Sequence, residues 1–137
     1  MRKKFYFIGF VLVLLCGCQA LPKDQERSIK QIAFTELGTK FAKSFADDDS
    51  KDFIECLAPQ VRQSFNEEKF IASYKEITEK FGKVESYELL CEIENPIYEI
   101  QIWKMRFVKK EILNDMLFRV LMVESDGDFQ VVSFAFL

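Results

Sequence analysis

Residues 124–136 read Glu-Ser-Asp-Gly-Asp-Phe-Gln-Val-Val-Ser-Phe-Ala-Phe. The dipeptide Asp126-Gly127 separates two apolar runs, and Asp-Gly between such runs is a strong signal for a two-residue β-hairpin turn. The pattern predicts one strand from Met116 to Glu124 and another from Phe129 to Phe136. The last part of the chain is therefore expected to be a β-hairpin.

Two further strands are predicted before this hairpin. From Lys83 the apolar residues recur at every second position, which indicates a strand with one buried face: Tyr87, Leu89, Cys91 and Ile93. Asn95-Pro96 then turns the chain into a second strand, from Ile97 to about Val108. Its apolar residues change parity, which predicts a β-bulge near Ile102-Trp103. Asn114-Asp115 suits a tight turn into the third strand.

Helical periodicity precedes the strands. A first helix is expected from about Ser28 to Ala46, with Gly38 marking close packing on a neighbour and an apolar stripe of Ile29, Ile32, Ala33, Leu37, Phe41 and Phe45. Asp49 or Ser50 caps a short second helix that ends before Pro59. Asn66 caps a third helix that ends at Gly82. The sequence thus predicts an α+β fold in residues 27–137, three N-terminal helices packed on a curved four-stranded antiparallel sheet.

This order of elements, with the closing hairpin of residues 124–136, resembles the cone-shaped fold of the nuclear transport factor two-like superfamily. The segment from Ile77 to Gly82, which enters the first strand, fits the same pattern. The resemblance covers residues 27–137 and implies a cystatin-like cone of helices and sheet. The fold hosts isomerases, dehydratases, cyclases and non-catalytic binding modules, so the resemblance implies no single function.

The N-terminal residues have the pattern of a secretory signal. Three basic residues are followed by an apolar run, Phe5 to Leu15, which is shorter than the ~20 residues that span a bilayer. Leu15-Cys16-Gly17-Cys18 resembles the lipobox of bacterial lipoproteins. The resemblance implies that residues 1–17 are a signal peptide, that Cys18 carries the lipid, and that residues 18–26 are a tether. An ordinary cleaved secretory signal is the alternative.

A lipobox places the domain in the cell envelope, attached to a membrane through Cys18. Gln19 is not the aspartate that resembles an inner-membrane retention signal. The expected site is therefore the outer membrane facing the periplasm in an organism with two membranes, and otherwise the outer face of the cell membrane.

Composition excludes several function classes. Removal of residues 1–17 leaves 16 basic and 22 acidic residues, a net charge of −6, which argues against nucleic acid as a partner. The chain has no histidine, so the usual general base and the commonest metal ligand are missing. Asp47-Asp48-Asp49 lacks the spacing and glycine of a calcium loop. No metal or cofactor is predicted. Cys56 and Cys91 are either a disulfide pair or two buried free thiols.

Two functions are compatible with this pattern. The first is a non-catalytic envelope module that binds a protein partner or a small apolar ligand. The second is a small isomerase-like or cyclase-like enzyme with a pocket inside the cone, for which the candidate residues are Tyr74, Glu99, Trp103 and Arg119. Each candidate also has a structural interpretation, as core or surface. A cavity with a carboxylate of raised pKa beside a tyrosine would favour the enzyme, and a cone filled by phenylalanines the binding module.

The predicted hairpin also suggests a partner for the sheet. Pairing Ser125 with Asp128 gives one face with Phe118, Val120, Met122, Phe129 and Val131, and another with Leu117, Leu121, Val123, Val132, Phe134 and Phe136. Both faces are largely apolar, although a sheet covered on one side should be polar on the other. The expectation is that a second copy covers the exposed face and forms a homodimer; the alternative is that the tether or a loop folds over it.

Overall fold

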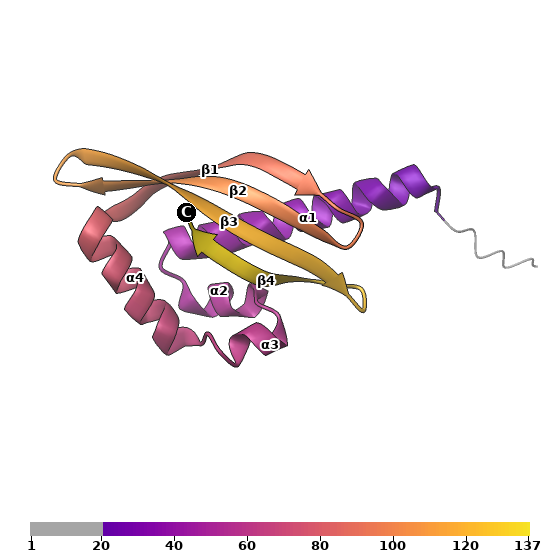
Figure 1. Cartoon of the computed structure of the whole chain (residues 1–137), viewed down its shortest axis with the longest axis horizontal. Helices are drawn as coiled ribbons and strands as arrows, with labels where there is room; N and C mark the ends of the chain where they lie inside the picture. The colour runs from indigo at the N-terminus through magenta and orange to yellow at the C-terminus, as the bar shows by residue number, and fades with distance from the viewer. Residues whose placement is uncertain (1–20) are drawn as a thin grey trace, which may run out of the picture.

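The computed structural model describes residues 21–137 and contains four helices followed by four strands (Figure 1). The helices are α1 (Lys23–Ala46), α2 (Ser50–Cys56), α3 (Pro59–Arg62) and α4 (Glu67–Phe81). The strands are β1 (Lys83–Glu94), β2 (Tyr98–Lys109), β3 (Ile112–Ser125) and β4 (Asp128–Phe136). The predicted signal peptide and the lipidation site Cys18 lie outside the described residues.

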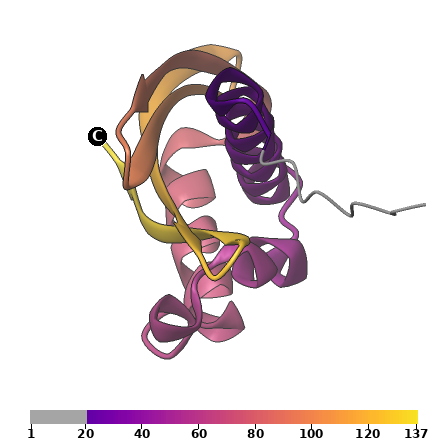
Figure 2. The same ribbon diagram turned by 90° about the vertical axis from the view of Figure 1, so that its right-hand side faces the viewer.

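The strands form an antiparallel meander in the order β1-β2-β3-β4, and the helices lie on one side of the curved sheet (Figure 2). The predicted α+β architecture is therefore confirmed. The additional helix is α3, a single turn between α2 and α4. Among residues 21–137, none of the helices combines the length and apolarity that a membrane crossing requires.

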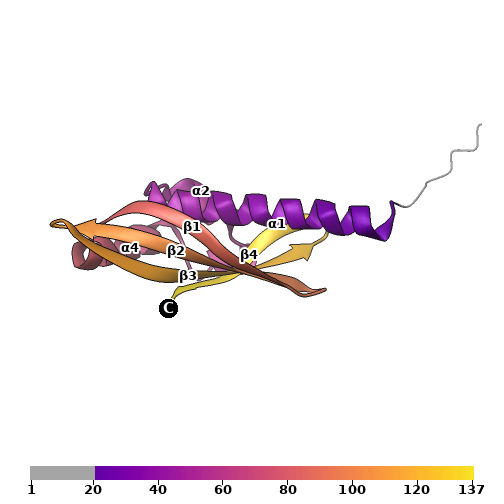
Figure 3. The same cartoon turned by 90° about the horizontal axis from the view of Figure 1, so that it is seen from above.

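Helix α1 begins at Lys23, five positions before the predicted start, so the end of the predicted tether is helical. From Phe34 onward it packs on the sheet, through Phe34, Phe41 and Phe45. Its N-terminal part extends past the end of the sheet (Figure 3). Ile29 and Ile32, which were expected on the buried stripe, are consequently 49% and 58% exposed.

The predicted caps of the other helices are confirmed. Asp49 accepts a hydrogen bond from the backbone N–H of Asp52 at the start of α2. Asn66 Oδ1 accepts one from the backbone N–H of Lys69, at 3.1 Å, at the start of α4. Gly82 ends α4 with a φ of 94°, a conformation that favours glycine.

The predicted bulge in β2 is wrong, because β2 pairs with β3 without interruption from Tyr98 to Lys109. The irregularity lies at the same level in the neighbouring strand: Leu89 pairs with Trp103 but Cys91 pairs with Ile102, so one extra residue is inserted in β1. Since an extra residue inverts the side-chain alternation, Cys91 is exposed rather than on the predicted buried face.

The turn between β2 and β3 lies at Lys110-Glu111, whose φ angles are 49° and 66°, and not at Asn114-Asp115. Strand β3 begins at Ile112, so Asp115 is within the strand. There its carboxylate receives two hydrogen bonds from Arg106 on β2, at 2.7 and 2.9 Å. This cross-strand pair stabilises an extended segment where the local sequence favours a turn.

A bulge in β4 changes the face of its last residues. Leu121 pairs with Ser133 and Met122 with Val131, so Val132 is the extra residue. The bulge turns Phe134 and Phe136 to the helix side, where both pack against the core. The predicted grouping of these two rings with Leu117 and Leu121 is therefore wrong, because Phe134 pairs with Val120 and Phe136 with Phe118.

Phenylalanine rings fill the space between the sheet and the helices. Five of them are less than 2% exposed: Phe41, Phe53, Phe70, Phe107 and Phe118. The rings of Phe41 and Phe53 stack with centroids 4.1 Å apart, and Phe118 lies 4.7 Å from Phe136. Aromatic pairs of this kind add about 1 kcal/mol each to the stabilisation from apolar burial.

Candidate functional site

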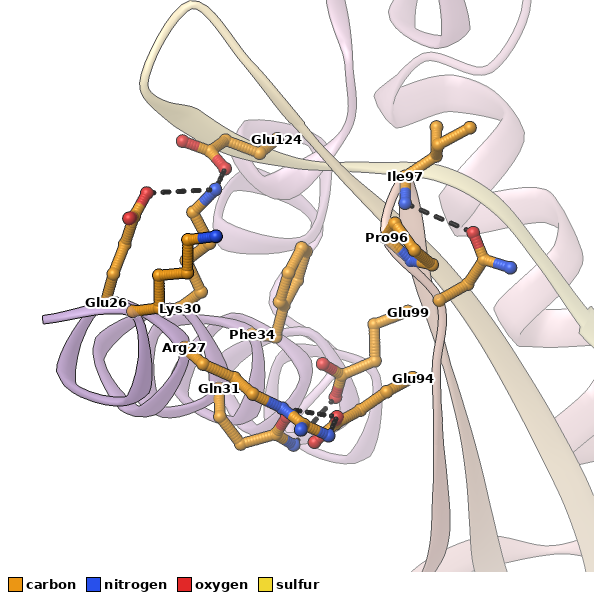
Figure 4. Close-up of a pocket in the computed structure, with 12 residues that line it drawn as sticks. Glu26, Arg27, Lys30, Gln31, Phe34, Glu94, Pro96, Ile97, Glu99 and Glu124 are labelled. Atoms are coloured by element: carbon orange, nitrogen blue, oxygen red, sulfur yellow. Dashed lines mark hydrogen bonds and ion pairs between the residues drawn. The ribbon is translucent and has the colours of Figure 1, made fainter.

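A pocket of about 500 Å³ opens between the N-terminal part of α1, the β1–β2 turn and the end of β3 (Figure 4). Phe34 from α1 and Pro96 and Ile97 from the turn form its apolar wall. Glu99, near the start of β2, lies on the sheet side. The pocket exists because α1 continues past the aromatic core, where the sheet and helix separate.

Strand β2 carries the buried polar groups of this site. Glu99 and Gln101 have the same parity as Trp103, Met105 and Phe107, and all five side chains face the helices. The apolar alternation of the core thus continues into two polar residues, Glu99 at 2% and Gln101 at 0% exposure. Burial of such groups requires hydrogen-bond partners, and the structure supplies them.

Gln101 is the centre of the hydrogen-bond network. Its Nε2 lies 2.9 Å from Glu92 Oε1 and 3.3 Å from Glu99 Oε1, and donates to these carboxylates. Its Oε1 accepts a hydrogen bond from Trp103 Nε1 at 3.0 Å. Gly38 of α1 allows this arrangement, because a Cβ on Gly38 would lie 1.7 Å from Gln101 Oε1. The close packing predicted for Gly38 is confirmed.

Helix α1 contributes two neutral donors to the same network. Gln31 Nε2 donates to Glu92 Oε2 at 2.6 Å and lies 3.4 Å from Glu99 Oε1. Thr35 Oγ1 donates to Glu92 Oε1 at 2.8 Å. Glu92 reaches these groups because the bulge in β1 turns it toward α1. Two carboxylates are therefore held side by side between helix and sheet by amide and hydroxyl donors.

Burial raises the pKa of Glu99 from its ordinary value of 4.5 to about 7. The hydrogen bond from Gln101 lowers this pKa, whereas the negative charges of Glu92 and Glu94 raise it further. Desolvation is the largest cause, as expected for a carboxylate removed from water without a cationic partner. Glu99 therefore exchanges its proton near neutral pH.

Two ion pairs join α1 to the sheet at the rim of the pocket. Arg27 bonds Glu94 on β1, and Lys30 Nζ lies 2.8 Å from Glu124 Oε2 on β3. All four side chains are at least one-third exposed. Exposed pairs contribute well under about 1 kcal/mol each, so these contacts position α1 without locking it.

The structure does not bring the four predicted pocket residues together. Glu99 lines the pocket, and Trp103 lies in the core beside it, connected through Gln101. Tyr74 lies on α4 against Phe45 and Phe70, where burial raises its pKa, with the charges of Asp48 and Asp47 as lesser causes. Arg119 is half-buried on β3, where it pairs with Ile102 and Ala135 on neighbouring strands.

Four residues of the network were not predicted from the sequence: Gln31, Thr35, Glu92 and Gln101. A signal for Gln101 was present, since it has the parity of buried Trp103 and Met105. Glu92 had no such signal, because its inward direction depends on the bulge. Of the two expected features, the raised-pKa carboxylate is present without an adjacent tyrosine, and the interior is filled by phenylalanines.

The two cysteines of the domain are free in the structure, and no disulfide joins them. Cys56 is buried at the end of α2, where burial raises the pKa of its thiol to about 11. Cys91 is exposed because of the bulge in β1, so the alternative of two buried thiols also fails for Cys91. Within residues 21–137, no group of three or more acidic or cysteine side chains could hold a metal ion.

Comparisons with solved structures define the class of fold. The chain superposes on a Nostoc punctiforme protein of unknown function with a cystatin-like fold, with a TM-score of 0.56 and 13% identity over 80% of this chain and 90% of that one. A Campylobacter jejuni protein named "Putative NTF2-like transpeptidase" matches with a TM-score of 0.54 and 14% identity, over 72% of this chain and 96% of that one. The chain therefore has the NTF2-like, cystatin-like fold.

A third similar structure is a protein from Rhodopseudomonas palustris that contains a SEC-C motif, with a TM-score of 0.54 and 15% identity over 72% of this chain and 74% of that one. No protein-family model and no curated protein sequence matches the chain. Identities this low show a common fold, and function has to be argued from the site.

Proposed function

We propose that this chain is a lipid-anchored lipoprotein of the cell envelope whose domain is a non-catalytic binding module. The anchor is inferred from the basic residues, apolar run and lipobox-like Leu15-Cys16-Gly17-Cys18. The binding module is supported by one structural observation, the interior filled by phenylalanine rings. A filled interior confines binding to the surface, and we assign it to the pocket at the N-terminal part of α1, which has an apolar wall.

A protein partner fits this pocket better than a small apolar ligand does. The pocket is open at its rim and lined by charged side chains from α1, β1 and β3. At its edge, the lining residue Ile97 is 76% exposed at the tip of the β1–β2 turn. An exposed apolar side chain next to a charged rim is typical of a protein contact.

Labelling with radioactive palmitate tests the anchor. In the full chain, Cys18→Ser should abolish incorporation and leave unprocessed precursor, because the lipid is attached to this thiol. Cys16→Ser is the matched control and should label like the wild type. Label retained in the Cys18→Ser protein would refute the lipoprotein assignment.

Photo-crosslinking in the native membrane tests the binding surface. Benzoylphenylalanine at Ile97 should give a discrete adduct with a protein partner. The same probe at Lys51, which is exposed on α2 on another part of the surface, should give none. Equal adducts at both positions, or none at Ile97, would contradict the pocket as the partner surface.

A small isomerase-like or cyclase-like enzyme remains the second candidate, favoured by the Glu99 pKa of about 7 beside a cavity. A carboxylate with this pKa can remove a proton adjacent to a carbonyl. In D₂O, the full chain would then exchange deuterium into a panel of simple cyclic ketones, and Glu99→Gln would stop the exchange. Absence of exchange above the buffer rate would exclude this activity on such ketones.

The outer face of the sheet is the surface we propose for a second copy of the chain. It carries half-buried apolar side chains from the two central strands, Ile100, Ile102, Leu121 and Val123, and all helices lie on the opposite side (Figure 2). Leu117 is 40% exposed on the same face. Contact between two such faces would remove this apolar surface from water.

A further inference from the structure

Glu99, which is buried, and Glu92, which is half-buried, lie beside each other without a cation. All side-chain donors to them among residues 21–137 are neutral: Gln31, Thr35 and Gln101. Two cations that line the pocket, Arg27 and Lys30, are paired with Glu94 and Glu124 instead. Two adjacent carboxylates held only by neutral groups leave negative charge without compensation.

One oxygen of Glu99 is available to a ligand. Both donors to Glu99 reach Oε1, and Oε2 accepts no hydrogen bond from residues 21–137. Every fully enclosed side-chain polar atom in that range has a hydrogen-bond partner. Because Oε2 has none, it is not fully enclosed, and Glu99 lines the pocket, so we take Oε2 to face its open space. A carboxylate that is only 2% exposed thus presents a single acceptor into the cavity (Figure 4).

The remaining walls limit the size and character of what could enter. Phe34, Pro96 and Ile97 line the approach, so a ligand stem in contact with them would be apolar. The volume of about 500 Å³ accommodates a small molecule or the end of a long side chain. The rim is open, so the stem can continue outward.

We propose that the pocket binds a primary ammonium group on a short aliphatic stem, with Glu99 as its anionic partner. This inference rests on the proposed binding function and names its ligand class. The ammonium can come from a free alkylamine or from a lysine side chain of the protein partner. Either source supplies a cation for Glu99 and its neighbour Glu92, and a stem for the apolar wall.

An ammonium group fits better than a guanidinium or a divalent cation. A guanidinium binds carboxylates through two parallel hydrogen bonds, but Glu99 offers one free oxygen. A divalent cation needs several oxygen ligands, and no suitable group of three acidic or cysteine side chains occurs in residues 21–137. An ammonium ion is a compact charge that one carboxylate oxygen can receive.

The charges around Glu99 leave the site negative. The facing groups are Lys23, Glu26, Arg27 and Lys30 on α1, Glu92 and Glu94 on β1, and Glu124 on β3. The cations of α1 are thus outnumbered by carboxylates even before Glu99 is counted. Ionisation of Glu99 increases this excess, so the local field favours a cationic ligand over an anionic one.

Proton binding competes with the ligand. Burial holds the pKa of Glu99 at about 7, so the carboxyl is largely protonated in mild acid and ionised in mild base. As the pH increases toward 7, the affinity for the ammonium should therefore increase by about tenfold per pH unit. Above about pH 7 it should be constant. A ligand bound only through the apolar wall would show no such dependence.

Fluorescence of Trp103 provides the measurement. It is the only tryptophan in the chain, and its indole N–H bonds Gln101, which in turn bonds Glu99. The full chain in mild detergent is titrated with n-butylammonium, with n-butyrate and n-butanol as probes of equal length. A saturable change with n-butylammonium alone at about pH 8 is expected, and weaker binding at about pH 6.

Two substitutions distinguish binding at Glu99 from a general effect of the protein's net charge. Glu99→Gln should lower the affinity for n-butylammonium by at least about tenfold, because the amide carries no charge. Glu88→Gln makes the same change of net charge on β1, at a residue that pairs with Lys104 away from the pocket, and should bind like the wild type. Far-UV circular dichroism verifies that both variants are folded.

Three results would overturn the proposal: no saturable change with n-butylammonium up to about 50 mM, equal binding of n-butyrate, or undiminished affinity in folded Glu99→Gln. Binding of N-acetyl-lysine methylamide as well as n-butylammonium would assign the ammonium to a protein lysine, and binding of n-butylammonium alone to a free amine. If crosslinking at Ile97 succeeds while the amines fail, the ligand class is wrong and the binding module stands.

Discussion

At Gly38 the backbone of α1 meets the side chain of Gln101, and this contact sets the distance between helix and sheet. A Cβ at position 38 would lie 1.7 Å from Oε1 and 2.6 Å from Cδ of Gln101. Gln101 is fully buried and bonded on both sides, so its side chain cannot simply turn away. The glycine is needed for space and not for its backbone freedom.

We expect Gly38→Ala to lower the free energy of unfolding by about 2 kcal/mol through overpacking. In an ordinary helix the same change raises stability by up to about 1 kcal/mol. In a Gln101→Ala background, Gly38→Ala should therefore become neutral or stabilising. Urea unfolding of the wild type, the two single variants and the double variant measures the coupling free energy between positions 38 and 101. An equal effect of Gly38→Ala in both backgrounds would contradict the contact.

Glu99 should make stability depend on pH. Its pKa is higher in the folded protein, about 7, than its ordinary value of 4.5, so the folded state holds the proton more tightly. The free energy of unfolding therefore falls as pH rises from about 4.5 to about 7, and is constant above that range as far as this group is concerned.

Glu99→Gln should remove this slope and raise the free energy of unfolding at about pH 8 by about 2 kcal/mol, since the amide resembles the protonated acid. Urea unfolding at several pH values between 4 and 8 provides the measurement. Glu88→Gln, at an exposed carboxylate whose pKa is lowered by Lys104, should keep the slope. A lower stability of Glu99→Gln at pH 8 would show that the carboxylate is needed in its charged form.

At the scale of elements, two hairpin turns use the same backbone conformation with different residues. Asp126 and Gly127 have φ angles of 53° and 82°, and Lys110 and Glu111 have 49° and 66°. Positive φ at both central residues defines a type I′ turn, which asparagine, aspartate and glycine adopt most easily. The backbone at Lys110-Glu111 is therefore strained, and the long β2–β3 pairing that follows from the turn holds it in this conformation.

Replacement of Lys110-Glu111 by Asn-Gly should raise the free energy of unfolding by about 1 kcal/mol, because a left-handed conformation costs about that much for ordinary residues. Gly127→Ala in the other turn should lower it by a similar amount. Thermal unfolding of both variants measures the effect. An unchanged or lower melting temperature for the Asn-Gly variant would contradict the turn at this position.

At the scale of the whole molecule, the outer face of the sheet has no helix of residues 21–137 packed on it. The inward turn of Phe134 and Phe136 makes this face less apolar than the sequence suggested. Ile100, Ile102, Leu117 and Leu121 still lie there, next to the charged groups of Lys104 and Arg106.

We expect the full chain in detergent to be a dimer by light scattering, with Leu121→Lys raising the dissociation constant at least about tenfold. Ile71→Lys is the matched control: Ile71 is 56% exposed on α4, on the helix side, and its replacement should leave the dimer intact. A wild type that stays monomeric at micromolar concentration would remove the second copy from the proposed function.

The sequence by itself determined the parts of the protein that depend on neighbouring residues. The caps at Asp49 and Asn66, the stop at Gly82 and the turn at Asp126-Gly127 follow from interactions across a few positions, so local patterns predict them. The alternation of the four strands and the period of the helices predicted the α+β fold for the same reason. Of the site, this reasoning supplied Glu99 and the close packing of Gly38.

Only the tertiary structure decided the direction of side chains beyond each bulge and the composition of the site. Whether Glu92 or Cys91 faces α1 depends on one inserted residue in β1, and the position of Phe134 depends on Val132 in β4. A bulge costs little locally and is selected by packing between segments that are distant in sequence. Glu92 thereby contacts Gln101 on the neighbouring strand and Gln31, which is 61 positions away in the sequence. Local periodicity cannot predict a contact between residues so far apart.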